Sequence, residues 1–215
     1  MNILARFIYR ILNKLYYLTA NFFSQLYLLV ALPASRIGHG KDLHINGFPR
    51  FIIHPNGKLQ IGNSFRMNSG KLHNPIGRNQ RCVISVSEKA ELKIGDHVGM
   101  SSVAIICQQQ ITIGDHVKIG GNTLIYDTDF HSLDASERSR IPELPEHINK
   151  KPVIIGNHVF IGGHCIILKG SNIGEYSIVG AGSVVSGTIP PYELWAGNPA
   201  RFIRKISLDE SPQSL

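Results

Sequence analysis

Charged residues are scarce in this 215-residue chain, at 17%, where about 25% is usual for a globular protein. Cysteine is scarcer still. The odd number and wide spacing of Cys82, Cys107 and Cys165 fit neither a disulfide framework nor a zinc pattern and favour a reducing compartment. The net charge is +7, but the basic residues form no single block. With no recognised nucleic-acid motif, we expect no nucleic-acid partner.

What the chain does contain is glycine, with 21 residues, and a 43% share of hydrophobic residues. Together these predict many tight turns and an extended buried face. The length is enough for one domain with a substantial core.

Residues 3–30 carry hydrophobic side chains at helical steps of three and four, with Arg6, Arg10 and Lys14 on the other side. This pattern favours a basic amphipathic helix lying on a membrane, and we expect residues 1–35 to form an N-terminal helical segment. Three alternatives stay open: a span, since 15–35 has no charge, a signal peptide, and a helix packed on this chain or a neighbouring subunit. The apolar positions are Leu4, Phe7, Ile8, Ile11, Leu12, Leu15, Leu18, Phe22, Leu26 and Leu29.

Beyond Pro33 the period changes to six. Aliphatic residues at this spacing are followed by Gly, Asp or Asn, which suit tight corners. A six-residue period predicts a solenoid of flat strands, about 18 residues a coil, with the aliphatic residue pointing inward. The repeating positions are Ile61 and Met67; Ile94, Met100 and Ile106; Ile113, Ile119 and Ile125; and Ile155, Ile161, Ile167, Ile173, Val179 and Val185.

The period does not give the hand of the coil. The hexads, such as IGDHV, IGNHV and VGAGS, resemble those of the hexapeptide-repeat acyltransferases. This resemblance implies an all-β fold, a left-handed parallel β-helix, over residues 36–206. A C-terminal capping segment would close it, and residues 207–215 would form a polar tail.

The period breaks over residues 127–152, a polar segment that predicts a long external loop. Its opening, YDTDFHSLD, resembles the catalytic segment of the maltose, galactoside and polysaccharide O-acetyltransferases. The resemblance implies that His131 is the general base that removes a proton from the acceptor hydroxyl, a task that suits histidine. Asp129 or Asp134 would orient the imidazole.

A metal site is the alternative role for the other histidines. The resembled fold also includes gamma-class carbonic anhydrases, which use three histidines across a subunit interface, two of them about five residues apart on one coil. His158 and His164 are six apart, and His39 and His44, which are five apart, precede the clear repeats. His97, His116 and His158 occupy equivalent corner positions, which we expect to face solvent. We therefore expect no metal.

The C-terminal segment VVSGTIPPYELWAGNPARFIRKI closely resembles the last coil of these acetyltransferases. Physically, Trp195, Phe202, Ile203 and Ile206 can cover the open end of the coil. The resemblance adds acetyl-CoA as donor, and arginine suits its phosphates. The positions matching the family's CoA-binding residues are Phe160, Gly163, Ala181, Ser186, Arg201 and Arg204.

The chain departs from the galactoside-type pattern at residues 99–102, where Ser101 and Ser102 replace an acceptor-binding asparagine, which argues against a free disaccharide as acceptor. The resemblance as a whole implies a homotrimeric O-acetyltransferase, and we expect it to modify a sugar hydroxyl of a surface polysaccharide. Its acceptor would be a glycan or glycolipid-linked sugar. We expect it in the cytoplasm, with residues 3–30 contacting the inner membrane face. The alternatives are an N-acetyltransferase of an amino sugar or nucleotide sugar, a non-enzymatic scaffold, and a carbonic anhydrase.

Overall fold

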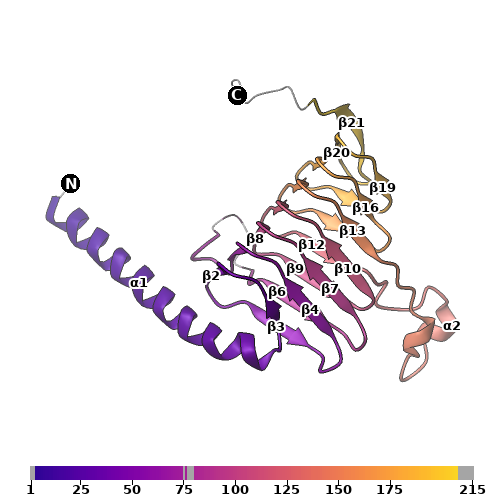
Figure 1. Ribbon diagram of the computed structural model, residues 1–215, viewed down its shortest axis with the longest axis horizontal. Coiled ribbons are helices and arrows are strands. Elements are labelled where there is room, and N and C mark those ends of the chain that lie inside the picture. Colours follow the sequence, from indigo (N-terminus) through magenta and orange to yellow (C-terminus); the bar gives the residue numbers. More distant parts are fainter. Residues whose placement is uncertain (1–2, 75, 77–79, 208–215) are drawn as a thin grey trace.

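The computed structural model describes residues 3–74, 76 and 80–207. One long helix precedes a three-sided stack of short parallel strands (Figure 1). Of the segments expected from the sequence, residues 1–2 of the helical segment and 208–215 of the polar tail lie outside the described residues.

Each coil of the stack contributes one strand to each of three sheets of parallel strands, except the last coil, which contributes β19 and β20 and no strand to the third sheet. Sheet A contains β1 (Gly38–His39), β4 (Lys58–Ile61), β7 (Glu91–Ile94), β10 (Gln110–Ile113), β13 (Val153–Ile155), β16 (Asn172–Ile173) and β19 (Thr188–Ile189). Sheet B contains β2 (His44–Asn46), β5 (Arg66–Asn68), β8 (Gly99–Ser101), β11 (Lys118–Ile119), β14 (Phe160–Ile161), β17 (Ile178–Val179) and β20 (Glu193–Ala196), with β21 (Arg201–Lys205) added antiparallel at its end. Sheet C contains β3 (Arg50–Ile53), β6 (Val83–Val86), β9 (Ala104–Cys107), β12 (Leu124–Tyr126), β15 (Ile166–Ile167) and β18 (Val184–Val185).

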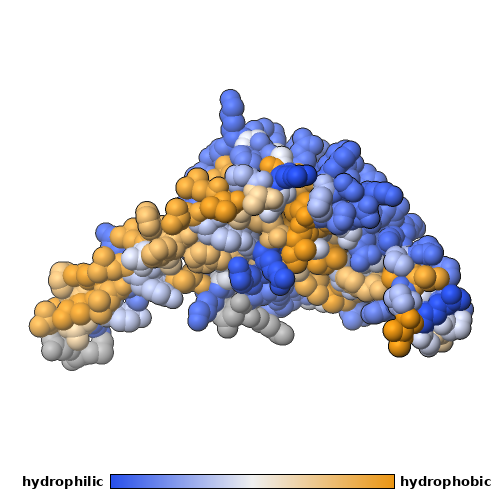
Figure 2. All heavy atoms as spheres, turned by 90° about the horizontal axis from the view of Figure 1, so that it is seen from below, coloured by the Kyte–Doolittle hydropathy of each residue, from blue (hydrophilic) through white to orange (hydrophobic). Residues whose placement is uncertain are grey.

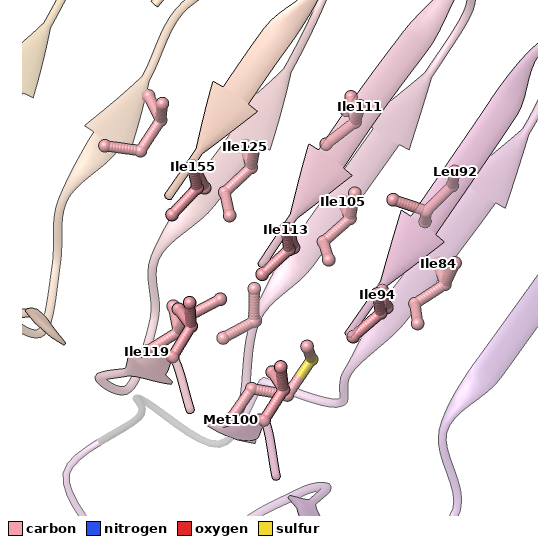
Figure 3. Close-up of a cluster of buried hydrophobic side chains, with 14 of the residues drawn as sticks. Ile84, Leu92, Ile94, Met100, Ile105, Ile111, Ile113, Ile119, Ile125 and Ile155 are labelled. Atoms are coloured by element: carbon pink, nitrogen blue, oxygen red, sulfur yellow. The ribbon is translucent and has the colours of Figure 1, made fainter. Parts of the chain in front are cut away.

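The core is a set of aliphatic columns that run along the stack (Figure 3). Ile113, for example, pairs in register with Ile94 on one side and Ile155 on the other, and all three are buried. This stacking confirms the inward positions expected from the six-residue period, with one exception. Ile106 points outward, and Ile105 is buried in its place.

The exception has a simple cause. At the corner between sheets B and C, four residues separate Met100 from Ile105 in this coil, one fewer than the five that separate their partners Ile119 and Ile125 in the next coil. A one-residue difference transfers alternate side chains to the opposite face of the next strand.

The corner between sheets A and B is uniform. Side-chain oxygens of Asp96, Asp115 and Asn157 each accept the backbone N–H of the equivalent corner residue one coil below, at 2.6–2.8 Å. The residues that follow stack their rings in one column with centroids 4.6–5.0 Å apart. Its members are His97, His116, His158, Tyr176 and Tyr192, all with positive φ. The three histidines are exposed at this corner, as expected.

Helix α1 (Ile3–Ala34) extends beyond the open end of the first coil (Figure 1). Its C-terminal half contacts the solenoid: Leu28 is buried, Gln25 Nε2 donates to the Ile45 carbonyl, and the Tyr27 hydroxyl donates to the Pro49 carbonyl. Hydrophobic residues lie exposed along its length (Figure 2). It is long and apolar enough to cross a membrane, by length and composition only.

At the other end of the stack, β20 and β21 form an antiparallel pair. Trp195 packs against the core and meets Phe202 edge-on, with ring centroids 6.5 Å apart. The side chains of Phe202 and Ile203 are nevertheless about half exposed. The expectation that they cover the core is therefore wrong for these two, because β21 extends the edge of sheet B and does not cross the end of the coil.

Candidate active site

The segment between β12 and β13 leaves the corner between sheets C and A. Its first residue, Asp127, is fully buried, and its carboxylate accepts the backbone N–H groups of Gln108, Gln109 and Gln110 at 2.7–2.8 Å. The backbone carbonyl of Asp127 accepts the Lys151 N–H at 3.0 Å, which ties the two ends of the segment together. His131 thus lies four residues from a firm anchor. The segment also contains the short helices α2 (Ala135–Arg138) and η1 (Pro145–His147).

His131 contacts one carboxylate. Its Nδ1 lies 2.8 Å from Oε2 of Glu143, and the other oxygen of Glu143 accepts the backbone N–H of Ser132. The His131 side chain is 69% exposed, whereas Glu143 is 15% exposed. A carboxylate at Nδ1 favours the tautomer in which Nδ1 carries the proton, which leaves Nε2 as a proton acceptor.

The partner of His131 differs from the two candidates named from the sequence. The carboxylate of Asp134 caps helix α2 through the N–H groups of Ser136 and Glu137, and Asp129 lies 3.2 Å from Lys169 Nζ. Neither aspartate therefore contacts the imidazole of His131, and Glu143 is the carboxylate that lies beside it. It lies twelve residues after His131, and only the folded course of the segment brings the two together.

The electrostatics fit an ionised Glu143. The hydrogen bond from the Ser132 N–H, followed by that from His131, holds the pKa of Glu143 below its usual value. The carboxylate therefore stays charged at neutral pH, and it can stabilise a positive imidazolium on His131.

The residues proposed for CoA fall into two groups. Ser186 and Arg201 line one small cavity of about 110 Å³ near the C-terminal end of the stack, and Arg204 follows on β21. Gly163 and Ala181 lie on consecutive coils at the corner between sheets B and C, and Phe160 points outward from β14, 48% exposed.

Within one chain, His131 and Gly163 are on opposite sides of sheet C. The segment bearing His131 leaves the corner between sheets C and A, whereas Gly163 lies at the corner between sheets B and C. A single subunit therefore does not bring the candidate base and this part of the CoA site together.

Among the described residues, no group of three or more His, Cys, Asp or Glu side chains is placed to hold a metal ion. His164, one residue after Gly163, instead accepts at Nδ1 a hydrogen bond from the side-chain Nδ2 of Asn122, at 3.0 Å.

The family model "Bacterial transferase hexapeptide (six repeats)" matches residues 152–187. WbbJ of Escherichia coli (strain K12), a proposed lipopolysaccharide biosynthesis O-acetyl transferase, is 30% identical over 170 residues, which cover 78% of this chain and 81% of WbbJ. The chain belongs to the hexapeptide-repeat acyltransferase family. This membership makes it an acyltransferase and confirms the left hand expected for its parallel β-helix.

Two solved structures share the fold. The hexapeptide-repeat acetyltransferase VCA0836 of Vibrio cholerae O1 biovar eltor, complexed with acetyl-CoA, has 30% identity and a TM-score of 0.50, covering 82% of this chain and 75% of its own. AntD, an N-acyltransferase from Bacillus cereus in complex with dTDP and 3-hydroxybutyryl-CoA, has 21% identity and a TM-score of 0.63, covering 79% and 83%. At that identity AntD shows the fold alone.

Proposed function

We propose that this chain is a sugar O-acetyltransferase of surface polysaccharide biosynthesis, with His131 as general base. Acetyl-CoA is the donor. The observation that carries the proposal is the contact between His131 Nδ1 and Glu143 on a side chain that is 69% exposed, which favours Nε2 as the proton acceptor. Nε2 takes the proton of the acceptor hydroxyl while its oxygen attacks the thioester carbon. The tetrahedral intermediate then expels CoA as thiolate, which regains the proton from the imidazolium.

Two observations support the class of acceptor: the sequence similarity to WbbJ and the exposed apolar surface of α1. The similarity to WbbJ extends over most of both chains, which supports an acceptor in surface glycan assembly. The exposed apolar side chains of α1 and its Arg6, Arg10 and Lys14 suit the anionic surface of a membrane. We therefore propose that residues 3–30 contact the cytoplasmic membrane face, where a lipid-linked glycan would be within reach.

A homotrimer would complete the site. The outer face of sheet C is mostly apolar, with Arg50 and Ser85 as polar members, whereas the outer face of sheet A carries Lys, Glu and Gln side chains. If three chains turn sheet C toward a common three-fold axis, the C–A corner of each chain meets the B–C corner of the next. His131 of one subunit would then face Gly163 of its neighbour. The outward residues of sheet C include Ile52, Val83, Ala104, Ile106, Leu124, Tyr126, Ile166 and Val184.

Donor binding is tested by thermal unfolding with and without acetyl-CoA. At about 100 times Kd, the ligand should add ~2.7 kcal/mol of apparent stability. We expect a smaller shift for Arg201→Ala/Arg204→Ala and an unchanged shift for Lys58→Ala/Lys93→Ala, which removes two cations from the outer face of sheet A. An equal shift in all three proteins would refute the role given to the two arginines.

The shared site is tested by mixing two inactive variants. We expect His131→Ala and Gly163→Leu each to abolish activity. Co-assembled at equal amounts, they should recover roughly a quarter of the wild-type rate, because a quarter of the sites combine an intact histidine with an intact glycine in random trimers. No recovery, or a monomeric mass in solution, would contradict the arrangement. A product that resists mild alkali would point to N-acetylation instead.

A further inference from the structure

A second extension leaves the solenoid between β5 and β6. We call its described residues, 69–74, 76 and 80–82, the 69–82 extension. It lies at the corner between sheets B and C, the same corner as Gly163 but nearer to α1. Between this extension, α1 and the first coil there is a pocket of about 550 Å³, a volume typical of small-molecule sites. The pocket is lined by Ala20, Tyr27, Gly47, Phe48, Ser69, Gly70, Lys71, Leu72, His73 and Arg81.

The lining combines an apolar floor with a basic rim. The rings of Tyr27 and Phe48 meet with centroids 5.7 Å apart, and Leu72 adds to the apolar surface. Lys71 and Arg81 are both exposed, and no lining residue is acidic. Such a pocket suits a ligand that joins a phosphate to an apolar or aromatic body.

One of these cations is held in position. Arg81 Nε donates to the carbonyl of Phe48 at 2.6 Å. This hydrogen bond fixes the guanidinium at the edge of the aromatic floor and leaves its two terminal nitrogens with no partner in the described part of the chain. They can therefore donate hydrogen bonds to two oxygens of an anion at the mouth of the pocket.

We propose that this pocket binds the phosphate end of the acceptor, which is a lipid-linked or nucleotide-linked sugar. The proposal rests on the proposed function, since it assigns a site to the acceptor of that same reaction. The pocket is not a part of the CoA site, because it lies beside the first two coils and the cavity bearing Ser186 and Arg201 lies at the opposite end of the solenoid.

The 69–82 extension also connects the pocket to the transfer site. Asn74, buried on this extension, packs so closely on Gly121 that a Cβ there would lie 2.6 Å from its amide nitrogen. The Gly121 carbonyl in turn accepts the N–H of His164, next to Gly163. Coils are spaced by about 4.8 Å, so the pocket and this corner are only a few strand spacings apart. If Lys71 and Arg81 hold the phosphate, the sugar attached to it would lie along the extension and point toward His131 of the neighbouring subunit.

The test is direct binding to the full-length protein, measured by calorimetric titration with three probes: farnesyl diphosphate, UDP and inorganic pyrophosphate. We expect farnesyl diphosphate or UDP to bind about tenfold more tightly than pyrophosphate, because only they fill the apolar floor. Lys71→Ala/Arg81→Ala should weaken that binding about tenfold or more, since each charged contact is worth about one decade. Lys58→Ala/Lys93→Ala is the charge-matched control, and Phe48→Ala should weaken the amphipathic probes without affecting pyrophosphate.

The ranking of the two amphipathic probes identifies the source of the phosphate: tighter farnesyl diphosphate assigns a lipid carrier, and tighter UDP a nucleotide sugar. Equal affinities for wild type and Lys71→Ala/Arg81→Ala would overturn the proposal, and so would pyrophosphate binding as tightly as both other probes. Absence of binding by all three at millimolar concentration would also overturn it, provided that acetyl-CoA still raises the Tm of the same preparation. Loss of the acetyl-CoA shift would instead mark failure of the proposed function.

Discussion

Replacing Glu143 by glutamine tests the assignment of the base and its partner. The substitution keeps the size of the side chain but removes the charge that faces His131 Nδ1 at 2.8 Å. Carboxylates that orient metal-bound histidines are typically worth about 10- to 100-fold in activity, and we expect a similar contribution from Glu143. We expect kcat to fall by that factor, since His131 is exposed and water partly replaces the lost contact. His131→Ala should cost more, about 10²- to 10⁴-fold.

The assay is release of free CoA thiol, with acetyl-CoA and acceptor each varied. The KM for acetyl-CoA should not change, because Glu143 lies outside the residues proposed to hold it. Asp134→Asn and Asp129→Asn are the controls, and we expect them to retain more activity than Glu143→Gln. If Glu143→Gln keeps full activity while one aspartate variant loses it, the assignment of Glu143 is refuted.

The pH dependence has a definite sign. Hydrogen bonds lower the pKa of Glu143, so its contribution is present at neutral pH and disappears only when the pH falls through that lowered pKa. Activity lost between pH 7 and about pH 5 therefore does not come from protonation of Glu143.

Three further predictions concern the scaffold. Ile167→Ala, at a fully buried position between Ile125 and Val185, should cost about 2–5 kcal/mol of unfolding free energy in urea, whereas Ile154→Ala, on the outer face of sheet A, should cost at most about 0.5 kcal/mol. Asp127→Asn should cost about 2–4 kcal/mol and should make residues 127–152 sensitive to limited proteolysis; unchanged stability and resistance would count against the anchor. Burial raises the pKa of Cys82 to about 11, so this thiol should resist alkylation at pH 8 until the protein unfolds. Because unfolding restores the ordinary value of 9.0, stability should fall as the pH rises above about 9.

The solenoid could be predicted from the sequence because its information is local and repeated. Each aliphatic residue of a hexad has the same inward environment, so an irregular residue in one hexad does not hide the period that the neighbouring hexads show. Ile106 shows the limit of this reasoning: a corner one residue shorter leaves the six-residue count intact in the sequence, yet it moves Ile105 inward. Only the pairing of Ile105 with Ile84 and Ile125 shows the shift.

The sequence supplies a candidate base through the resemblance rather than through the repeat. His131 follows directly after a hexad, and its position could be matched to the family's segment. Glu143 could not, since α2 and the turn after it decide which carboxylate returns to the imidazole. The pocket beside α1 was also missed, because it is formed by three segments that are distant in the sequence: the helix, the first coil and the 69–82 extension.

The three corners of the solenoid show where function lies. The A–B corner is closed along most of its length by the Asp and Asn side-chain ladder and by the column of stacked rings, and it carries no extension. Both long extensions, residues 69–82 and 127–152, leave instead from the two corners that border sheet C. Within one chain the two extensions do not meet, because sheet C separates them. In the trimer proposed above, the extension bearing His131 would lie against the extension bearing Lys71 and Arg81 of the next subunit, and such a trimer would explain both the largely apolar outer face of sheet C and the division of the site.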